Sequence, residues 1–599
     1  MNKSINNQTN KLRVTSYKLR DLPFTLLLFF LLALYIPAQA QQLRWHWAIQ
    51  ASGAQDNHVC AAVCDTAGNV FLSGSYADTI RFEHLTLPPY GGQDIFIAKF
   101  DPDGLPKWAK SAGGINDDYP TAMTLSPLGD IIIAGVSGKN ADFGGLTTGK
   151  RRINLFIGAY SPEGDAKWVK SFGAVRNDYI KAITTDSIGN IYFAGYFSRQ
   201  LEGEDFSLDA TSIANAMVIC LDSLGQTLWA QQFYSEYGEN RITALCHHGN
   251  NLWIAGICNA PTDINGTMLT PVQEGAAVIF TARFDEYGNI DDVYSVLEAA
   301  NAEITSLTAT EEGLLILGGN FSNFLNINIF STKKLQLPNI IGIIPSLPSN
   351  VPSGLTSYGN QDMFLAAIHT DGIAWIKQIG STSYDNLLSV AYHPGKHIIA
   401  TGLYSGTLIV DKDTIGINNA FCDVFTASYR IDGQIQEVVT MGGTSEEYPM
   451  AMTFDKEGHI FIAGLFRDTT TLRKSTLYTP SRIDEVFLAK LHHCNKHRII
   501  FTCDSVFIEG DILMLGLKGE YEKYEWDEGV SSSQNFIIYY NKTYQVLVSD
   551  SLGCVYKDSI TIRQIPVVPE WQIRGELIQD ANKGRLLAAY RNKEARKEN

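Results

Sequence analysis

The sequence predicts an all-β protein: a seven-bladed β-propeller closed by its N-terminal strand, followed by a small β-sandwich. The first observation is an apolar strand ending in glycine, which recurs at Gly74, Gly135, Gly195, Gly256, Gly319, Gly402 and Gly464. The spacing is about 60 residues, and repeats of this length with several short strands are typical of propellers. The other two observations are a recurring tryptophan and a pair of unmatched strands at the two ends of the repeat array.

Each repeat contains three further strands around the glycine-ended strand. A strand of small residues precedes it, and an alternating strand that often opens with Asp or Asn follows it. A fourth strand is led by tryptophan at Trp47, Trp108, Trp168, Trp229 and Trp375. Tyr294 and either Val438 or Val439 are expected at the two remaining tryptophan positions. Asp-x-x-Gly turns, as at 101–104, join the last two strands in a tight hairpin, since glycine accepts a positive φ.

The two ends of the array complement each other. The seventh alternating strand, 484–491, has no tryptophan strand after it, and the first tryptophan strand, 45–50, has no alternating strand before it. The sequence therefore predicts that 45–50 pairs with 484–491 and closes the ring, which removes exposed sheet edges. Small residues on the first strand predict that it is innermost, where the sheets converge: Ala61, Ala122, Ala182, Ala244, Ser306, Ser389 and Ala451. The alternative interpretation is a ring of hydroxyls for a ligand.

Residues 1–40 have the features of a cleaved signal peptide. Basic residues lie between Lys11 and Arg20, residues 22–37 are almost wholly apolar, and Ala38-Gln39-Ala40 is an A-x-A cleavage site. The alternative is a membrane anchor, but the apolar run is short for a span of about 20 residues. We expect a secreted or cell-surface protein with no transmembrane span in the mature chain.

Charge and cysteine content limit the partners and the fold class further. The net charge of −16 argues against nucleic acid and anionic membranes as partners. The nine cysteines are sparse for 599 residues, so the chain is no disulfide scaffold although export permits disulfides. Cys60 and Cys64 lie on one face of a strand and are expected to pack rather than pair.

The sequence divides into four parts: a signal peptide at 1–40, the propeller at 41–493, the sandwich at 494–565 and a polar basic tail at 566–599. An insertion at 325–357, rich in Pro, Ser and Gly, is predicted to be a loop with either a functional role or none. Within the sandwich, Trp526 is the expected core aromatic.

No catalytic, cofactor or metal site is predicted. The chain lacks the H-E-x-x-H, G-x-S-x-G, P-loop and C-x-x-C motifs. The adjacent histidines at 247–248 and 492–493 would point to opposite faces of a strand. The acidic turns at 101–104 and 285–292 lack the full spacing of a calcium loop.

These repeats resemble the bacterial seven-bladed β-propeller repeat family (SBBP repeats), whose units read W-x-x-x-x-G and then D-x-x-G-N-x-Y-x-x-G. Here the pattern runs from Trp168 to Gly173 and from Asp186 through Asn190 to Gly195. Residues 521–554 are similar to the PKD/Ig-like modules that follow such propellers in surface proteins of Bacteroidetes-type bacteria. The resemblance implies extracellular binding or scaffolding and supplies no catalytic residues.

The sequence thus predicts an exported, non-enzymatic and monomeric surface protein for adhesion, ligand binding or scaffolding, whose partner is an extracellular protein or glycan. The alternative is an extracellular propeller enzyme that acts on polysaccharide. A disulfide between Cys503 and Cys554, which bracket the Ig-like module, is the candidate cross-link, with Cys494 as the competing partner. It would stabilise the module by roughly 4 kcal/mol in the chain-entropy model.

Overall fold

A computed structural model describes residues 43–565 with short gaps. The gaps are at 174–177, 332–351, 370–371, 394, 412, 473–474, 480–482, 495–498, 502–505, 509–512, 528, 530, 539–541 and 551–553. The described residues form strands and turns without any helix, and among them no helix is long and apolar enough to span a membrane. The predicted signal peptide, most of the 325–357 insertion, Cys503 and the basic tail lie outside the described residues.

Four-stranded antiparallel units follow one another along residues 43–493. Unit 1 contains β2 (Asn57–Cys64), β3 (Val70–Tyr76), β6 (Asp94–Phe100) and β7 (Pro106–Ala112). Unit 2 contains β8 (Tyr119–Leu125), β9 (Ile131–Ser137), β10 (Asn154–Tyr160) and β11 (Ala166–Gly173). Unit 3 contains β12 (Tyr179–Thr185), β13 (Ile191–Phe197), β16 (Asn215–Leu221) and β17 (Thr227–Gln232). The strand order in these units is the one predicted from the repeat.

The next three units are joined into one larger sheet by continuous and bridging strands. Unit 4 contains β19 (Asn240–His248), β20 (Asn251–Cys258), β23 (Ala276–Phe284) and the first half of β24 (Ile290–Ala309). Unit 5 contains the second half of β24, β25 (Leu315–Ser331), β27 (Asp362–His369) and β28 (Gly372–Gly380). Unit 6 contains β29 (Asn386–His393), β30 (His397–Val410), β31 (Asp413–Arg430) and β32 (Ile435–Met441).

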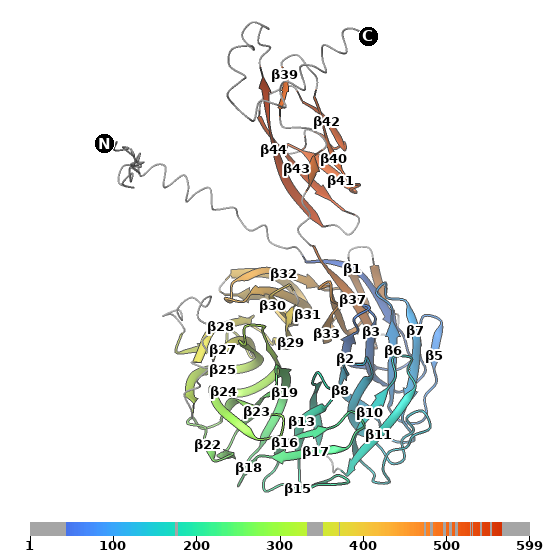
Figure 1. Ribbon diagram of the computed structural model, residues 1–599, viewed down its shortest axis with the longest axis vertical. Coiled ribbons are helices and arrows are strands. Elements are labelled where there is room, and N and C mark those ends of the chain that lie inside the picture. Colours follow the sequence, from blue (N-terminus) through green and yellow to red (C-terminus); the bar gives the residue numbers. More distant parts are fainter. Residues whose placement is uncertain are drawn as a thin grey trace, which may run out of the picture. The chain divides into compact units, whose positions relative to one another are not determined.

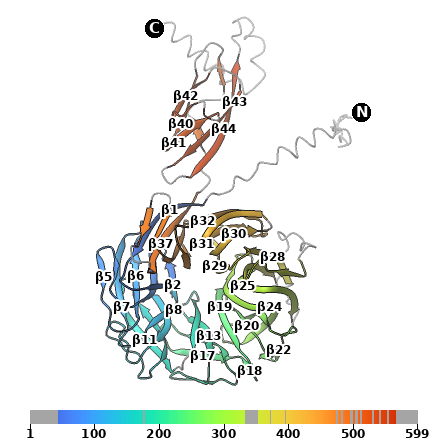
Figure 2. The same ribbon diagram turned by 180° about the vertical axis from the view of Figure 1, so that it is seen from behind.

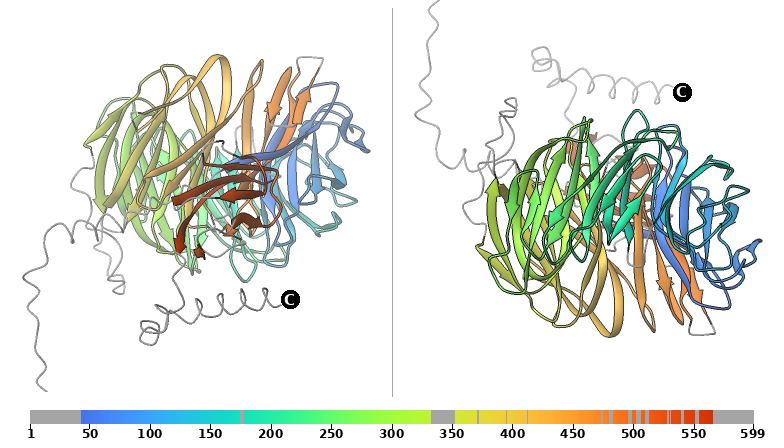
Figure 3. Two further views of the ribbon diagram at one scale, coloured as in Figure 1. Left: turned by 90° about the horizontal axis from the view of Figure 1, so that it is seen from above. Right: turned by 90° about the horizontal axis from the view of Figure 1, so that it is seen from below.

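Unit 7 combines the two ends of the array. It contains β33 (Glu447–Phe454), β34 (Ile460–Phe466), β37 (Glu485–His493) and β1 (Leu43–Ala51). Strand β1 pairs antiparallel with β37, from Leu43 opposite His493 to Ala51 opposite Val486. The predicted pairing of the two unmatched strands is therefore present, and Figure 3 shows the blue β1 beside the orange strands of unit 7.

The units are arranged around a common centre, with the small-residue strands innermost (Figures 1 and 2). Contacts between these first strands run from β2 through β8, β12, β19, β24, β29 and β33 in turn, and from β33 back to β2. Small residues such as Ala122 and Ala244 are buried there, as predicted for the place where sheets converge. Short outer strands complete the array: β4 (Ile80–Phe82), β5 (Leu85–Leu87), β14 (Gln200–Glu202), β15 (Ser207–Asp209), β18 (Tyr234–Ser235), β21 (Thr262–Ile264), β22 (Thr267–Leu269), β26 (Gly354–Thr356), β35 (Thr469–Leu472) and β36 (Ser475–Tyr478).

The recurring tryptophans connect five of the units to the next one through its hairpin turn. A Cβ placed at Gly164, which has φ +86°, would lie 3.1 Å from the Trp108 ring. Any larger residue in this turn would therefore crowd the indole and strain the backbone. The Trp108 Nε1–H also donates to the carbonyl of Pro162, at 3.2 Å. The same packing of an indole ring against a turn glycine pairs Trp47 with Gly104, Trp168 with Gly225, Trp229 with Gly288 and Trp375 with Gly433.

The expected substitutes for tryptophan are wrong. Trp108 lies opposite Lys99, just after a β-bulge, and the corresponding positions in units 4 and 6 hold Asp292 opposite Arg283 and Glu437 opposite Ser428. Tyr294, Val438 and Val439 lie one or two residues further along their strands. The β-bulge determines which residue occupies the tryptophan position, so choosing the nearest apolar residue gave the wrong one. Counting four residues from the turn glycine finds the position: Gly104 to Trp108, Gly288 to Asp292 and Gly433 to Glu437.

Glu437 has a distinct partner because no hairpin joins β37 to β1. Its Oε2 accepts a hydrogen bond from the Leu43 backbone N–H at 2.7 Å, and its Oε1 lies 3.3 Å from Arg44 Nη1. Trp45 Nε1–H donates to the carbonyl of Thr440 at 3.0 Å. A carboxylate on unit 6 therefore holds the start of β1 where other units present an indole to a turn.

The described strands from Ile500 to Ile565 form two further sheets that share one core. One sheet contains β38 (Ile500–Phe501), β40 (Leu513–Lys518) and β42 (Asn535–Ile538). The other contains β39 (Val506–Ile508), β44 (Val555–Ile565), β43 (Lys542–Ser549) and β41 (Lys523–Trp526). Trp526 is fully buried in the shared core, as the sequence predicts.

The predicted disulfide is wrong in one partner. Cys554 is bonded to Cys494, with 5.6 Å between their Cα atoms, and not to Cys503. Both half-cystines belong to the buried core around Trp526. Cys494 comes directly after β37, so the bond connects the end of the repeat array to the sandwich. The six cysteines described within residues 43–493 are free, which agrees with the expectation that Cys60 and Cys64 do not pair, and Cys64 packs against a core cluster.

Candidate functional site

The predicted glycines shape the inner strands rather than a ligand site. A Cβ at Gly74 would lie 1.9 Å from the carbonyl oxygen of His58, and one at Gly195 would lie 1.9 Å from that of Tyr179. Only glycine permits this approach of the second strand to the first. The residues whose carbonyls face the seven glycines, which we name the axial residues, are His58, Tyr119, Tyr179, Arg241, Glu303, Asn386 and Tyr448.

A β-bulge follows two residues after each axial residue. The register of unit 3 shifts between Ile180 and Ala182, so Lys181 is left unpaired, and the same shift recurs in every unit. Bulges turn side chains away from the regular pleat. The unpaired bulge residues are Cys60, Thr121, Lys181, Thr243, Thr305, Leu388 and Met450.

Solvent reaches these innermost strands. His58, Lys181 and Glu303 are exposed although their strands are the innermost of the units, and the other axial and bulge residues are partly exposed. The axial positions carry five kinds of side chain, with tyrosine at three of the seven, whereas the glycine, small-residue and tryptophan positions vary less. The centre of the array thus combines a repeated frame with an unrepeated set of side chains.

Aromatic and cationic side chains form one cluster across units 2 to 4. The Tyr179 and Tyr196 rings lie 5.6 Å apart at 50°, and Tyr119 shares a hydrogen bond with Tyr179. Lys181 Nζ lies 5.5 Å from the centre of the Tyr179 ring, and the Arg241 guanidinium lies 4.7 Å from that of Tyr196. We name Tyr119, Tyr179, Lys181, Tyr196 and Arg241 the axial cluster.

Burial and charge define what the cluster can do. Burial raises the pKa of Tyr119 and of Tyr196, while the Arg241 charge acts against the rise at Tyr196, so both phenols remain protonated donors at neutral pH. Arg241 also forms an ion pair with Glu239. Nearby, burial raises the pKa of Cys60 to about 12 against the opposing charge of Lys181. That thiol is protonated at neutral pH and is not poised as a nucleophile.

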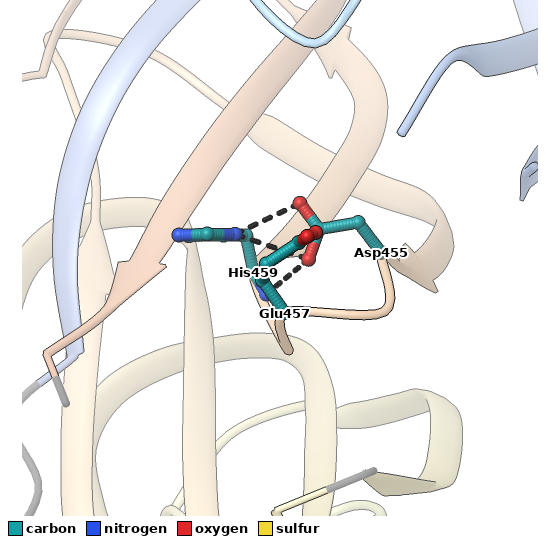
Figure 4. A group of neighbouring side chains, drawn as sticks. All are labelled: Asp455, Glu457 and His459. Carbon is teal, nitrogen blue, oxygen red and sulfur yellow. Dashed lines mark hydrogen bonds and ion pairs between the residues drawn. The ribbon is translucent and has the colours of Figure 1, made fainter. Parts of the chain in front are cut away.

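A second group of chemistry-bearing residues lies at the turn before β34. Figure 4 shows the His459 ring directed at the Asp455 carboxylate, with Glu457 beside them. His459 Nδ1 lies 2.8 Å and 3.0 Å from the two Asp455 oxygens. Burial acts to raise the pKa of Asp455, but hydrogen bonds from His459 and the charge of Lys490 lower it overall.

The Asp455 turn is a variant of the turn found in other repeats. Asn69 Nδ2–H donates to Asp65 at 2.8 Å, and Asn190 Nδ2–H donates to Asp186 at the same distance. His459 takes the place of this asparagine, so its Nδ1 is already engaged. The Lys490 ammonium, 3.7 Å from the Asp455 carboxylate, further opposes a cation. This group closes a turn and is not the candidate site.

The axial residues were missed in the sequence, although a signal was present. Each lies three residues before a recurring small residue: Tyr119 before Ala122, Tyr179 before Ala182 and Arg241 before Ala244. Reading the unrepeated positions around the small residue would have found them. The tryptophans and the turn glycines, in contrast, lie together at the contacts between neighbouring units, while the predicted strand glycines face the first strand of their own unit.

Comparison with known proteins gives distant similarities. No family model matches the chain. An uncharacterized WD repeat-containing protein of Acanthamoeba polyphaga mimivirus is 24% identical over 222 residues, which are 31% of this chain and 16% of that protein. The chain therefore matches only a small part of that relative's length.

Solved structures that match the chain include a WD40 β-propeller domain and a lyase. The WD40 β-propeller domain of Doa1 matches 76% of this chain and 97% of that chain, with a TM-score of 0.34 and 7% identity. A catalytically inactive virginiamycin B lyase from Staphylococcus aureus matches 75% and 100%, with a TM-score of 0.35 and 12% identity. At these TM-scores the similarities carry no argument. From its own strand pattern, the chain is a β-propeller-type repeat protein.

Proposed function

We propose that this chain is an exported, non-enzymatic propeller of seven blades that binds an extracellular glycan or protein through the axial cluster. Adhesion or scaffolding at the cell surface would be its role, with the domain limits 1–40, 41–493, 494–565 and 566–599. The SBBP-type repeats and the PKD/Ig-like module are part of this proposal. A monomer needs no partner chain to complete such a ring.

The proposed blade number and closure are supported by two observations. The contacts among the first strands return from β33 to β2, so each of units 1 to 7 has two neighbours. Strand β1 supplies the fourth strand of unit 7 and presents Trp47 to Gly104 of unit 1. A ring also leaves no unit without a neighbour to bury its faces.

The contrast between repeated and unrepeated positions carries the proposed binding function. Side chains that only hold units together can be the same in every unit, and the tryptophans and turn glycines largely are. Recognition of one ligand by a nearly symmetric frame requires different groups at equivalent positions. The axial positions offer aromatic, cationic, acidic and amide side chains within one solvent-reached ring.

A binding role is favoured over catalysis by the groups in the cluster. General acid–base or nucleophilic catalysis needs a group whose pKa matches the operating pH and a partner within hydrogen-bond reach. The cluster instead offers protonated phenols, Lys181 and an Arg241 already paired with Glu239. Cys60 is held as a neutral thiol by burial.

The proposal is tested with the purified chain beginning at Gln41. The experiment is a glycan and extracellular-protein array, followed by the same array with Tyr179→Ala. Binding that is lost in the variant, with the melting temperature retained, is the expected result. Turnover of a polysaccharide by the parent would favour the enzyme alternative, and an array without any ligand would contradict the proposed function. N-terminal sequencing of protein from the culture medium tests export and cleavage before Gln41.

A further inference from the structure

We infer that the axial cluster recognises a sugar ring that carries one carboxylate, as in a uronate-containing polysaccharide. The inference deepens the proposed binding function and rests on it. It depends on three features of the cluster: an ammonium without a counter-ion among the described residues, a neutral polar surround, and tyrosine rings whose cation-binding faces already have partners.

The Lys181 ammonium is an uncompensated charge in the described part of the chain. It forms no ion pair with any residue that the structure describes, and it is exposed on an innermost strand. Arg241, the other cation of the cluster, is paired with Glu239. In a chain of net charge −16, an uncompensated cation at the centre of the array is a specific feature and suits an anionic group on a ligand.

The surround of Lys181 is polar and neutral. The bulge residues of the two neighbouring units are Thr121 and Thr243, and the Cys60 thiol is close enough for Lys181 to lower its pKa. The hydroxyl oxygen of Thr243 is buried and has no hydrogen-bond partner among the described residues. Hydroxyl and protonated thiol groups carry no charge, so they leave the Lys181 charge uncompensated.

The tyrosines favour a sugar ring over a cationic ligand. Aromatic rings can bind cations through their faces, but Lys181 and Arg241 already lie over Tyr179 and Tyr196. A second cation would be repelled by both. The phenol hydroxyls at the ring edges can still hydrogen-bond to the hydroxyl groups of a neutral sugar ring.

The balance of charge favours a monoanion. One uncompensated ammonium matches one carboxylate, whereas a phosphate or a densely sulfated chain would require several cations. Glu303 is exposed and its charge reaches Tyr196, so additional negative charge on a ligand would meet repulsion. A single carboxylate on a neutral sugar chain fits this arrangement.

Calorimetric titration of the chain from Gln41 with two oligosaccharides tests the inference. The probes are a galacturonate oligosaccharide and its neutral galactose counterpart, at low and at high salt. We expect the galacturonate to bind, with affinity falling as salt rises. Lys181→Ala should lower its affinity about tenfold or more, as for a lost charge-assisted hydrogen bond, and Lys181→Arg should retain part of it.

The control variant is Lys167→Ala, which removes an exposed lysine paired with Asp130 on the outer strand of unit 2. Its affinity should equal that of the parent, and all variants should melt as the parent does. Equal binding of the charged and neutral probes, or a galacturonate affinity unchanged by Lys181→Ala, would overturn the carboxylate inference. Absence of galacturonate binding while the array finds another ligand would overturn it too and leave the proposed function standing.

Discussion

The outer and inner strands of the units use their side chains in opposite ways. On the outer strands, Trp108 and its counterparts contact the turn of the next unit through the same indole-to-glycine packing. On the inner strands, equivalent positions hold histidine, tyrosine, arginine, glutamate and asparagine. The indoles of the outer strands pack against a turn within the chain, whereas His58, Lys181 and Glu303 on the inner strands are exposed. The residues that stabilise the contacts between units are thus nearly the same in most units, whereas the residues of the candidate site vary more from unit to unit.

The largest expected effect is the loss of β1. Deleting residues 41–52 should leave β37 as an exposed edge and remove the Trp47 contact to unit 1, so the protein should lose cooperative unfolding and aggregate. Size-exclusion chromatography and thermal unfolding measure this. Truncation after residue 565 is the control, because it removes no described strand. A deletion variant that stays monomeric with an unchanged melting temperature would refute closure by β1.

Overpacking of an inner strand should have the next largest effect. Ala122 is buried opposite Ala134 on β9, so Ala122→Leu should lower the free energy of unfolding by about 1–3 kcal/mol. Ala67→Leu is the matched control, since Ala67 is exposed in a turn whose counterpart in unit 2 is Leu128. Chemical denaturation compares the two variants. If Ala122→Leu unfolds like the control, the inner strands are not tightly packed.

The junction between units 6 and 7 should respond to Glu437→Gln by a smaller amount. Burial raises the pKa of Glu437, and the bonds from Leu43 and Arg44 oppose that rise by stabilising the carboxylate. Replacing the carboxylate should cost about 1 kcal/mol, because an amide still accepts one hydrogen bond. Limited proteolysis near Leu43 should become faster, while exposed Glu457→Gln should change neither property. An unchanged rate of proteolysis would show that the contacts of Glu437 with Leu43 and Arg44 do not fix the start of β1.

A further prediction concerns pH. Burial raises the pKa of Glu447 to about 8 and that of Asp118 to about 7, with neighbouring Asp423 and Asp94 adding to the rise. Between their unfolded values and these pKa values, the folded state binds more protons than the unfolded state. The free energy of unfolding should therefore fall as the pH rises from about 5 to about 8.5. Asp118→Asn should flatten the dependence in urea denaturation, unlike exposed Asp103→Asn; equal slopes would contradict this assignment.

The strand order and the pairing of β1 with β37 could be predicted because they follow from repeated residues. The glycine-ended strand, the tryptophan and the turn recur, and the unmatched strands at the two ends determine each other. The positions of Asp292 and Glu437 were mispredicted because a bulge sets their register. The partner of Cys554 depends on the burial of Cys494 in the sandwich core, which the spacing of cysteines alone leaves open.

The candidate site was harder to predict because its residues come from different strands and different units. Tyr196 joins the axial cluster from a second strand, and Arg241 reaches it from the neighbouring unit. Such contacts depend on how units pack around the centre. The sequence pattern of one repeat contains no information on that packing.

The ligand-induced shift in melting temperature of two variants tests the central contrast most directly. Trp168→Ala on an outer strand and Lys181→Ala on an inner strand are compared with the parent, with and without the galacturonate oligosaccharide. Trp168→Ala should lose about 2 kcal/mol of stability, less than a fully buried aromatic because Trp168 is half-buried, yet retain the full ligand-induced shift. Lys181→Ala should melt like the parent without ligand and lose the shift. The opposite pattern, or equal losses of stability and of the shift in both variants, would contradict the division between frame and site.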